Sequence, residues 1–272
     1  MSDIHPEITT LKDVARRVRA HVIRVVREVG GGHIGGPLSA ADLLAALYFH
    51  QLRIRPEQPD WPERDRFILS KGHCALALYA TLAERGYLPV SELSRFGALG
   101  SRLQAHPDMT KAPGIDFSTG SLGQGLSAGV GMALAARLRQ AAYHTYVMLG
   151  DGEALEGQVW EAAIFAGARK LANLTAIIDY NKLSQTGPTA PLHGLLAERW
   201  RAFGWEVREI GGHDLTAILP ALQPGSDRPV AVVAHTVKGR GVSFMEGRSE
   251  WHSGSLTAEQ AAAALAELGV SE

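Results

Sequence analysis

Cysteine is almost missing from this chain, since only Cys74 occurs among 272 residues. An intrachain disulfide is therefore excluded, and the composition is typical of a reducing, cytoplasmic setting. Charge of one sign is also lacking, because a net charge of -1 provides no electrostatic attraction for nucleic acid or an anionic membrane. No apolar run approaches the ~18 residues of a membrane span. The opening residues, MSDIHPEITT, lack the basic and apolar regions of a secretory signal.

The residues that are abundant favour one large globular unit. Apolar residues make up 46% of the chain and charged residues 20%, which is enough to build a sizeable core. Helical and strand patterns alternate along the chain, without internal repeats or low-complexity stretches. We therefore expect a single domain covering residues 1–272.

The most informative segment runs from His144 to Gly187. Residues 146–149 (YVML) form an apolar run typical of a strand that is buried on both faces, and a Gly-Asp-Gly turn follows it. Apolar positions between about 157 and 170 have a helical period, and residues 174–178 (LTAII) read as the next strand. Asp179, Tyr180 and Asn181 are expected just past that strand's end. A right-handed crossover makes the two strands parallel, so Asp151 and Asn181 should emerge at the same sheet edge.

An aspartate and an asparagine at neighbouring strand ends are hard oxygen ligands for a small divalent cation. Two side chains do not complete an octahedral shell, and the backbone carbonyl of Leu183, a water and two diphosphate oxygens would supply the rest. Mg²⁺ fits this set, and Ca²⁺ or Mn²⁺ can substitute for it. The alternative interpretation is that Asp151 caps the following helix and Asn181 makes a turn.

The remaining patterns predict an α/β fold with a doubly wound, mostly parallel sheet and helices on both faces. An opening helix should end at glycines 30–32, and Ser39 with Asp42 reads as a capping box that opens a second helix through about Leu52. Further strands are expected at 67–69, 205–210 and 230–235. Helices are expected at 72–84 and 122–140, where the many glycines of the latter indicate close packing.

The GDG turn, followed after about thirty residues by an asparagine, resembles the diphosphate–metal motif of thiamine diphosphate enzymes. The longer text GDGEALEGQVWEAA resembles the transketolase family in particular. Other segments resemble that family in the same order, namely GGGHIGGPLSAADLL (30–44), DRFILSKGHCALALYA (65–80), AHPD (105–108), STGSLGQGLSAGVGMALA (118–135) and HTVKGRGVSFMEGRSEWHSG (235–254). Ordered motifs along nearly the whole chain are far more specific than any single one.

The resemblance implies roles for particular residues. His33 and His106 would contact sugar hydroxyls, whereas His73 and His252 would lie beside the diphosphate and the reactive carbon. Such a cluster of neutral imidazoles suits proton movement between alkoxides near pH 7. The resemblance also implies a set of cofactor contacts from the loop at 120–122, the GDG turn and the residues after it, and two of these histidines. The set is Gly120, Ser121, Leu122, Gly150, Asp151, Gly152, Glu156, Asn181, His73 and His252. Glu156 would either interact favourably with the N-terminus of the following helix or take part in a subunit-interface network. Lys238 would either approach phosphate or lie solvated in a loop.

The implied activity is transferase chemistry, in which thiamine diphosphate carries a two-carbon ketol group from a ketose to an aldose. The resemblance covers an N-terminal, diphosphate-binding half, while the pyrimidine and C-terminal domains of the family are not in this chain. A partner subunit would then supply the glutamate that activates the cofactor, most simply in a two-plus-two heterotetramer. The alternatives are another thiamine enzyme, such as a deoxyxylulose-phosphate synthase or a specialised sugar ketolase, and a non-catalytic, cofactor-holding subunit.

Overall fold

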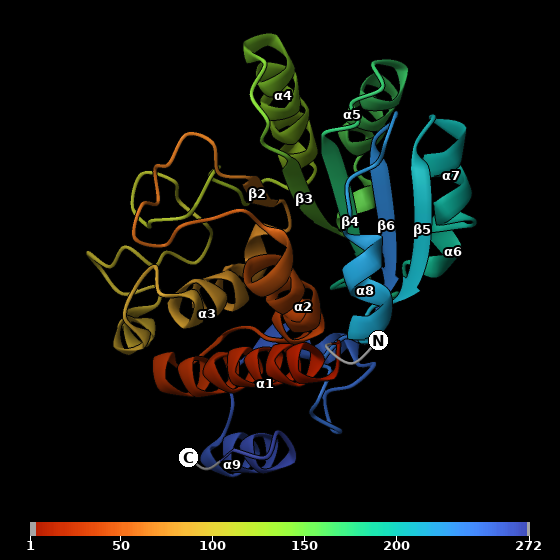
Figure 1. Ribbon diagram of the computed structural model, residues 1–272. Coiled ribbons are helices and arrows are strands. Elements are labelled where there is room, and N and C mark those ends of the chain that lie inside the picture. The colour runs from red at the N-terminus through yellow and green to blue at the C-terminus, as the bar shows by residue number, and fades with distance from the viewer. Residues whose placement is uncertain (1–3, 271–272) are drawn as a thin grey trace.

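A five-stranded parallel sheet forms the centre of the computed structural model, which describes residues 4–270 (Figure 1). The strands lie in the order β2-β3-β4-β6-β5, and every neighbouring pair is parallel. Their bounds are β2 (Arg66–Leu69), β3 (Thr145–Gly150), β4 (Leu174–Tyr180), β5 (Glu206–Gly211) and β6 (Val230–His235). The predicted strands and the predicted parallel arrangement are confirmed. One detail was wrong, because β4 includes Asp179 and Tyr180, which were expected beyond its end.

Helices cover both faces of the sheet, which confirms the doubly wound fold class. One core cluster joins Tyr146, Met148 and Ile177 of the sheet to α1 (Ile4–Val29), α2 (Gly35–Ala46), α3 (Ala75–Arg85), α8 (Leu215–Ala221) and α9 (Ala258–Glu267). The other joins Val147 and Ile178 to α4 (Gln124–Arg139), α5 (Gly157–Ala168) and α7 (Leu196–Ala202). Alternate strand residues face opposite sides, so each central strand contributes to both cores.

The glycines of α4 allow this helix to lie very close to the sheet, as their number predicted. A Cβ added at Gly125 would lie 2.4 Å from Ser70 Oγ, and one at Gly129 would lie 2.4 Å from Val147 Cγ2. Both distances are far below van der Waals contact. The helix begins at Gln124, two residues later than expected.

The capping box predicted at Ser39 and Asp42 was wrong. Helix α2 already begins at Gly35, its N-cap residue is Ile34, and Ser39 lies buried inside it. The Ser39 hydroxyl donates to the Gly36 carbonyl and to the Asp179 carboxylate. The Asp42 carboxylate pairs with Arg19 of α1 and with His213 of the loop after β5. Past Ala46 the chain continues as a π-helical turn, η1 (Leu47–Gln51), before it leaves the helix near the predicted end.

Several short elements complete the fold and were not predicted. A two-stranded antiparallel sheet joins β1 (Gly32–His33) to β7 (Ser253–Gly254). In residues 4–270, the 3-10 turns η3 (Val90–Arg95), η4 (Glu153–Leu155) and η5 (Ser249–His252) and the short helix α6 (Ala190–His193) lie in connections. The helix predicted at 72–84 is present as the 3-10 turn η2 (Gly72–Cys74) followed by α3. Within residues 4–270, no helix is both long and apolar enough to cross a membrane.

Candidate functional site

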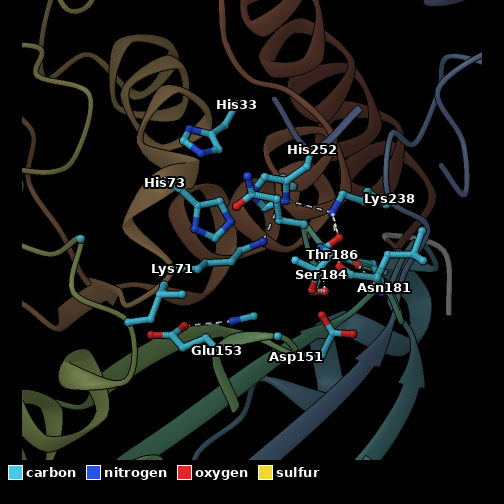
Figure 2. A pocket seen from close by; sticks show the side chains of 17 residues that line it. His33, Lys71, His73, Asp151, Glu153, Asn181, Ser184, Thr186, Lys238 and His252 are labelled. Atoms are coloured by element: carbon cyan, nitrogen blue, oxygen red, sulfur yellow. Dashed lines mark hydrogen bonds between the residues drawn. The ribbon is translucent and has the colours of Figure 1, made fainter. Parts of the chain in front are cut away.

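A cavity of about 290 Å³ lies at the carboxyl ends of the central strands, between the sheet and the loops that follow it. This is the edge at which open parallel sheets bind ligands. Figure 2 shows Asp151 and Glu153 on the sheet side of the cavity and His33, His73 and His252 across from them. The lining residues come from widely separated segments, namely His33, Gly36, Lys71, His73, Gly120, Leu122, Gly150, Asp151, Gly152, Glu153, Asn181, Leu183, Ser184, Gln185, Thr186, Lys238 and His252.

Asp151 and Asn181 both line this cavity, as the parallel-strand argument predicted. Asp151 is 2% exposed and accepts a hydrogen bond from the Thr189 hydroxyl. Burial raises the pKa of its carboxyl to about 6. Among the described residues no lysine, arginine or histidine forms a salt bridge with it. A buried carboxylate without a cationic side-chain partner fits a site that receives a metal ion.

The other two predicted metal ligands, Asn181 and the Leu183 carbonyl, lie in the loop after β4. Asn181 Oδ1 accepts from the Leu183 amide at 3.1 Å, and the Leu183 carbonyl accepts from Lys238 Nζ at 3.3 Å. One carboxylate, one amide oxygen and one carbonyl are suitable ligands for Mg²⁺ when a diphosphate adds more oxygens. No cluster of three or more His, Cys, Asp or Glu in residues 4–270 could hold a metal. These three oxygen donors fit a cation whose remaining ligands are oxygens of a bound molecule.

The helix-capping alternative for Asp151 does not agree with the structure. The N-cap residue of α5 is Glu156, and the turn η4 separates it from the GDG sequence. The turn alternative for Asn181 is seen in its bond to Leu183, and that bond leaves further acceptor capacity on the amide oxygen.

Four histidines lie together, as the family resemblance implied. The His33 ring centroid lies 5.1 Å from that of His73 and 5.3 Å from that of His252, and His73 and His252 are 5.2 Å apart. His106 lies 6.5 Å from His33 but is exposed and lines a neighbouring groove. Burial lowers the pKa of His73 to about 2 and that of His252 to about 4. Nearby lysine ammonium groups act in the same direction. Both imidazoles are therefore neutral near pH 7.

Two buried lysines border these histidines, namely Lys71, to which the sequence analysis gave no role, and Lys238, for which it left two roles open. Lys71 is 1% exposed, and its ammonium pairs with the Asp179 carboxylate at the end of β4. Lys238 is 2% exposed and contacts the Leu183 and Ser184 carbonyls and His252 Nδ1. A solvated loop position had been considered for Lys238, and the structure excludes it. No local pattern in the sequence signalled either burial.

Glu153 is a further buried group that sequence reasoning did not assign to the site. Its carboxylate accepts from the Ser70 hydroxyl, from the Gly123 amide at 2.8 Å and from the Gly150 amide at 3.1 Å. It thus ties the loop before α4 to the end of β3. Its position two residues after Asp151 was the available signal.

The other predicted cofactor contacts divide into two groups. Gly120, Leu122, Gly150 and Gly152 line the cavity. Ser121 and Glu156 are exposed and do not line it. Their roles in holding a cofactor stay predictions.

The family model described as "Transketolase, thiamine diphosphate binding domain" matches residues 10–272. The chain belongs to the transketolase family. Crystallised transketolase from Campylobacter jejuni superposes with a TM-score of 0.91 at 34% identity, covering 96% of this chain and 43% of that protein. The predicted resemblance and the predicted thiamine diphosphate-binding fold are confirmed.

Relatives of two lengths share this similarity. The 6-deoxy-6-sulfo-D-fructose transketolase subunit SqwG of Clostridium sp. (strain MSTE9) is 46% identical, over 95% of this chain and 96% of its own length. An apulose-4-phosphate transketolase subunit of Phocaeicola vulgatus is 43% identical, over 96% of this chain and 95% of its own length. Mouse transketolase is 41% identical, and the match spans 42% of its length. The chain thus equals the subunit-type relatives in extent and spans about two-fifths of the long ones.

The low pKa of His73 predicts an acid-sensitive fold. An ordinary histidine titrates at 6.5, so the unfolded chain binds a proton there that the folded chain does not bind until about pH 2. The free energy of unfolding should therefore fall as the pH drops below about 6.5. Urea unfolding at several pH values measures this slope, and His73→Gln should make it shallower. An equal slope in both proteins would show that His73 is not held neutral.

Proposed function

We propose that this chain is the diphosphate-binding subunit of a two-polypeptide transketolase. Transketolases of this kind move a two-carbon ketol group from a ketose to an aldose. The observation that carries the proposal is the length of the match, because relatives that are named subunits match this chain over 95% and 96% of its length. The buried cavity with its histidines supports a catalytic subunit over a purely cofactor-holding one.

Within this proposal, Asp151, Asn181 and the Leu183 carbonyl would hold Mg²⁺ together with the diphosphate of the cofactor. Thiamine diphosphate, when bound, supplies the nucleophilic carbon and the electron sink for breaking the carbon–carbon bond. The ammonium of Lys238 would neutralise phosphate charge near Leu183, and Gly120, Leu122 and Gly152, which line the cavity, would lie against the cofactor.

In this proposal the histidines bind the sugar and move protons at its oxygen atoms. His33, His73 and His252 are neutral, so each can accept a hydrogen bond at one ring nitrogen and donate one at the other. That suits them to orient sugar hydroxyls and to accept or return a proton at an alkoxide oxygen. His106, at the exposed end of the cluster, would contact the part of the sugar nearer the entrance.

The partner subunit would contribute the glutamate that activates the cofactor. Only two carboxylates, Asp151 and Glu153, line the cavity among the described residues. Asp151 is assigned to the metal, and Glu153 already accepts from two backbone amides and a hydroxyl. We infer that the carboxylate at the opposite, pyrimidine end of the cofactor is the glutamate of the partner subunit. The simplest assembly is a two-plus-two heterotetramer in the cytoplasm.

The names of the two subunit-type relatives also suggest a class of substrate. The name of the first relative includes a sulfonated ketose and that of the second a phosphorylated sugar, so both sugars carry an anionic group. We infer that this enzyme acts on sugars with such a group, which includes pentose phosphates and more specialised sugars. A panel of phosphorylated and sulfonated donors would identify the substrate.

The purified chain alone is expected to show essentially no ketol transfer. With thiamine diphosphate, Mg²⁺ and an aldose acceptor, its rate should rise by several orders of magnitude once the pyrimidine-domain polypeptide is added, because activation requires that polypeptide's glutamate. A partner in which this glutamate is replaced by glutamine serves as the control. Robust turnover by the chain alone would contradict the proposal, and turnover with pyruvate as donor would favour a synthase.

A further inference from the structure

A buried hydrogen-bond network extends away from the cavity and joins two helices to two sheet loops. Arg19 of α1 forms a salt bridge with Asp42 of α2, and these residues are 7% and 6% exposed. The same carboxylate contacts His213 Nδ1 at 2.7 Å, in the loop after β5. Burial raises the pKa of Asp42, but Arg19 and His213 together lower it by more, so the net shift is downward. Asp42 is therefore ionised.

The protonation of His213 follows from its two partners. The Val237 amide donates to His213 Nε2 at 2.9 Å, so this nitrogen has no proton. The proton must lie on Nδ1, where it is donated to Asp42. A carboxylate that selects the tautomer in this way commonly orients an imidazole whose other nitrogen binds a metal or accepts a hydrogen bond. In this protein the other nitrogen, Nε2, accepts the hydrogen bond of the Val237 backbone amide in the loop after β6.

That amide immediately precedes Lys238, whose side chain enters the cavity. Lys238 Nζ lies 3.0 Å from His252 Nδ1 and 3.1 Å from the Ser184 carbonyl. Its stem passes so close to Gly35 that a Cβ there would lie 2.7 Å from Lys238 Cγ. On the other side, the Lys238 carbonyl accepts from the Gly247 amide at 2.9 Å. The backbone around Lys238 is thus held on both sides, and His213 provides the hold on the N-terminal side.

We propose that His213 is a positioning residue that sets Lys238 in the cofactor cavity, and that Asp42 and Arg19 in turn orient His213. None of these three residues lines the cavity itself. The inference rests on the proposed function, since it assigns Lys238 to the cofactor's diphosphate. Its consequence is that cofactor affinity depends on a hydrogen bond outside the cavity.

Two substitutions of His213 separate the two halves of the network. In His213→Asn the amide lies where Nδ1 was, which keeps a partner for Asp42 and loses the acceptor for Val237. In His213→Gln the amide reaches the place of Nε2 and keeps that acceptor. Titration calorimetry with thiamine diphosphate and Mg²⁺ on the chain assembled with its partner should show an affinity about tenfold weaker for His213→Asn. The affinity of His213→Gln should stay within about threefold of that of the unmodified enzyme.

A buried histidine at the opposite end of the sheet provides the matched control. His144 is 7% exposed, and its Nε2 is bonded to the Thr175 hydroxyl at 2.8 Å. It is remote from the cavity lining. His144→Asn should lower the melting temperature and leave cofactor affinity unchanged. If His213→Asn behaves in the same way, its role is purely structural and the inference is overturned.

A double-mutant cycle with Lys238→Met tests whether His213 acts through the lysine. The His213→Asn effect on cofactor affinity should largely disappear in the Lys238→Met background. An equal effect in both backgrounds would overturn the inference and leave the proposed function standing. If Lys238→Met alone leaves the affinity unchanged, the assignment of Lys238 to the diphosphate fails as well, so the two failures are distinguishable.

Discussion

Replacing Asp151 with alanine is expected to abolish magnesium-dependent binding of thiamine diphosphate, with an affinity loss of about 100-fold or more. The variant removes the one carboxylate among the predicted metal ligands and leaves the loop oxygens unable to hold the cation. Asn181→Ala should have a comparable effect, because Asn181 supplies a ligand from the neighbouring strand end. Titration calorimetry of the assembled enzyme, with and without Mg²⁺, measures both losses.

A surface aspartate serves as the control for these variants. Asp227 is exposed, pairs with its neighbour Arg228 and is not among the residues that line the cavity. Asp227→Ala should therefore bind cofactor and metal like the unmodified protein. Unchanged cofactor affinity in both Asp151→Ala and Asn181→Ala would refute the metal assignment.

Replacing Lys71 with methionine is expected to lower the free energy of unfolding by about 3–5 kcal/mol. Lys71 and Asp179 are both almost completely buried, so the variant leaves a carboxylate in the interior without its counter-charge. The hydroxyls of Ser39 and Thr236 still donate to Asp179 but carry no charge. Although burial alone raises the pKa of Asp179, the Lys71 ammonium lowers it more, and the net shift is downward. Urea denaturation near pH 7 measures the loss.

Two controls separate the buried charge from lost packing. The double variant Lys71→Met/Asp179→Leu removes both charges and should recover much of the stability, as apolar replacements of buried pairs often do. Arg228→Met breaks the exposed pair with Asp227 and should change the free energy of unfolding by at most about 1 kcal/mol. A loss of that small size for Lys71→Met would show that Asp179 does not depend on the ammonium.

Much of the sheet could be predicted because buried parallel strands have continuous apolar runs. The positions of Asp151 and Asn181 then followed from the handedness of one crossover, which is a local property of adjacent elements. The end of β4 was predicted too early, because Asp179 is a charged residue within a buried strand. Its partner Lys71 lies 108 residues away in the sequence, and no periodicity signals such a pair.

Local patterns also misled where long-range contacts decide the outcome. Ser39 and Asp42 have the spacing of a capping box, yet both side chains bond to distant elements. Ser39 donates to Asp179, and Asp42 pairs with Arg19 and His213. Gly35 and Gly36 begin the helix earlier than the pattern indicates because the loop of Lys238 packs against Gly35.

The histidine cluster was predicted by family resemblance, and its geometry comes from an element too short to predict. The β1–β7 pairing joins His33 to Ser253, and the Ile34 amide donates to the His252 carbonyl at 3.2 Å. These bonds hold two imidazoles from opposite ends of the chain next to each other. Two-residue strands have no detectable periodicity, so sequence patterns could not reveal this pairing.

The central claim, that one divalent cation joins Asp151 and Asn181 to the cofactor's diphosphate, is tested most directly by crystallography with Mn²⁺ in place of Mg²⁺. Crystals of the assembled enzyme containing thiamine diphosphate should show an anomalous peak within ligand distance of Asp151, Asn181 Oδ1 and the Leu183 carbonyl, roughly 2.0–2.3 Å away. Diphosphate oxygens should complete the shell. Bound cofactor with no anomalous peak between these residues, or a metal held elsewhere, would contradict the claim.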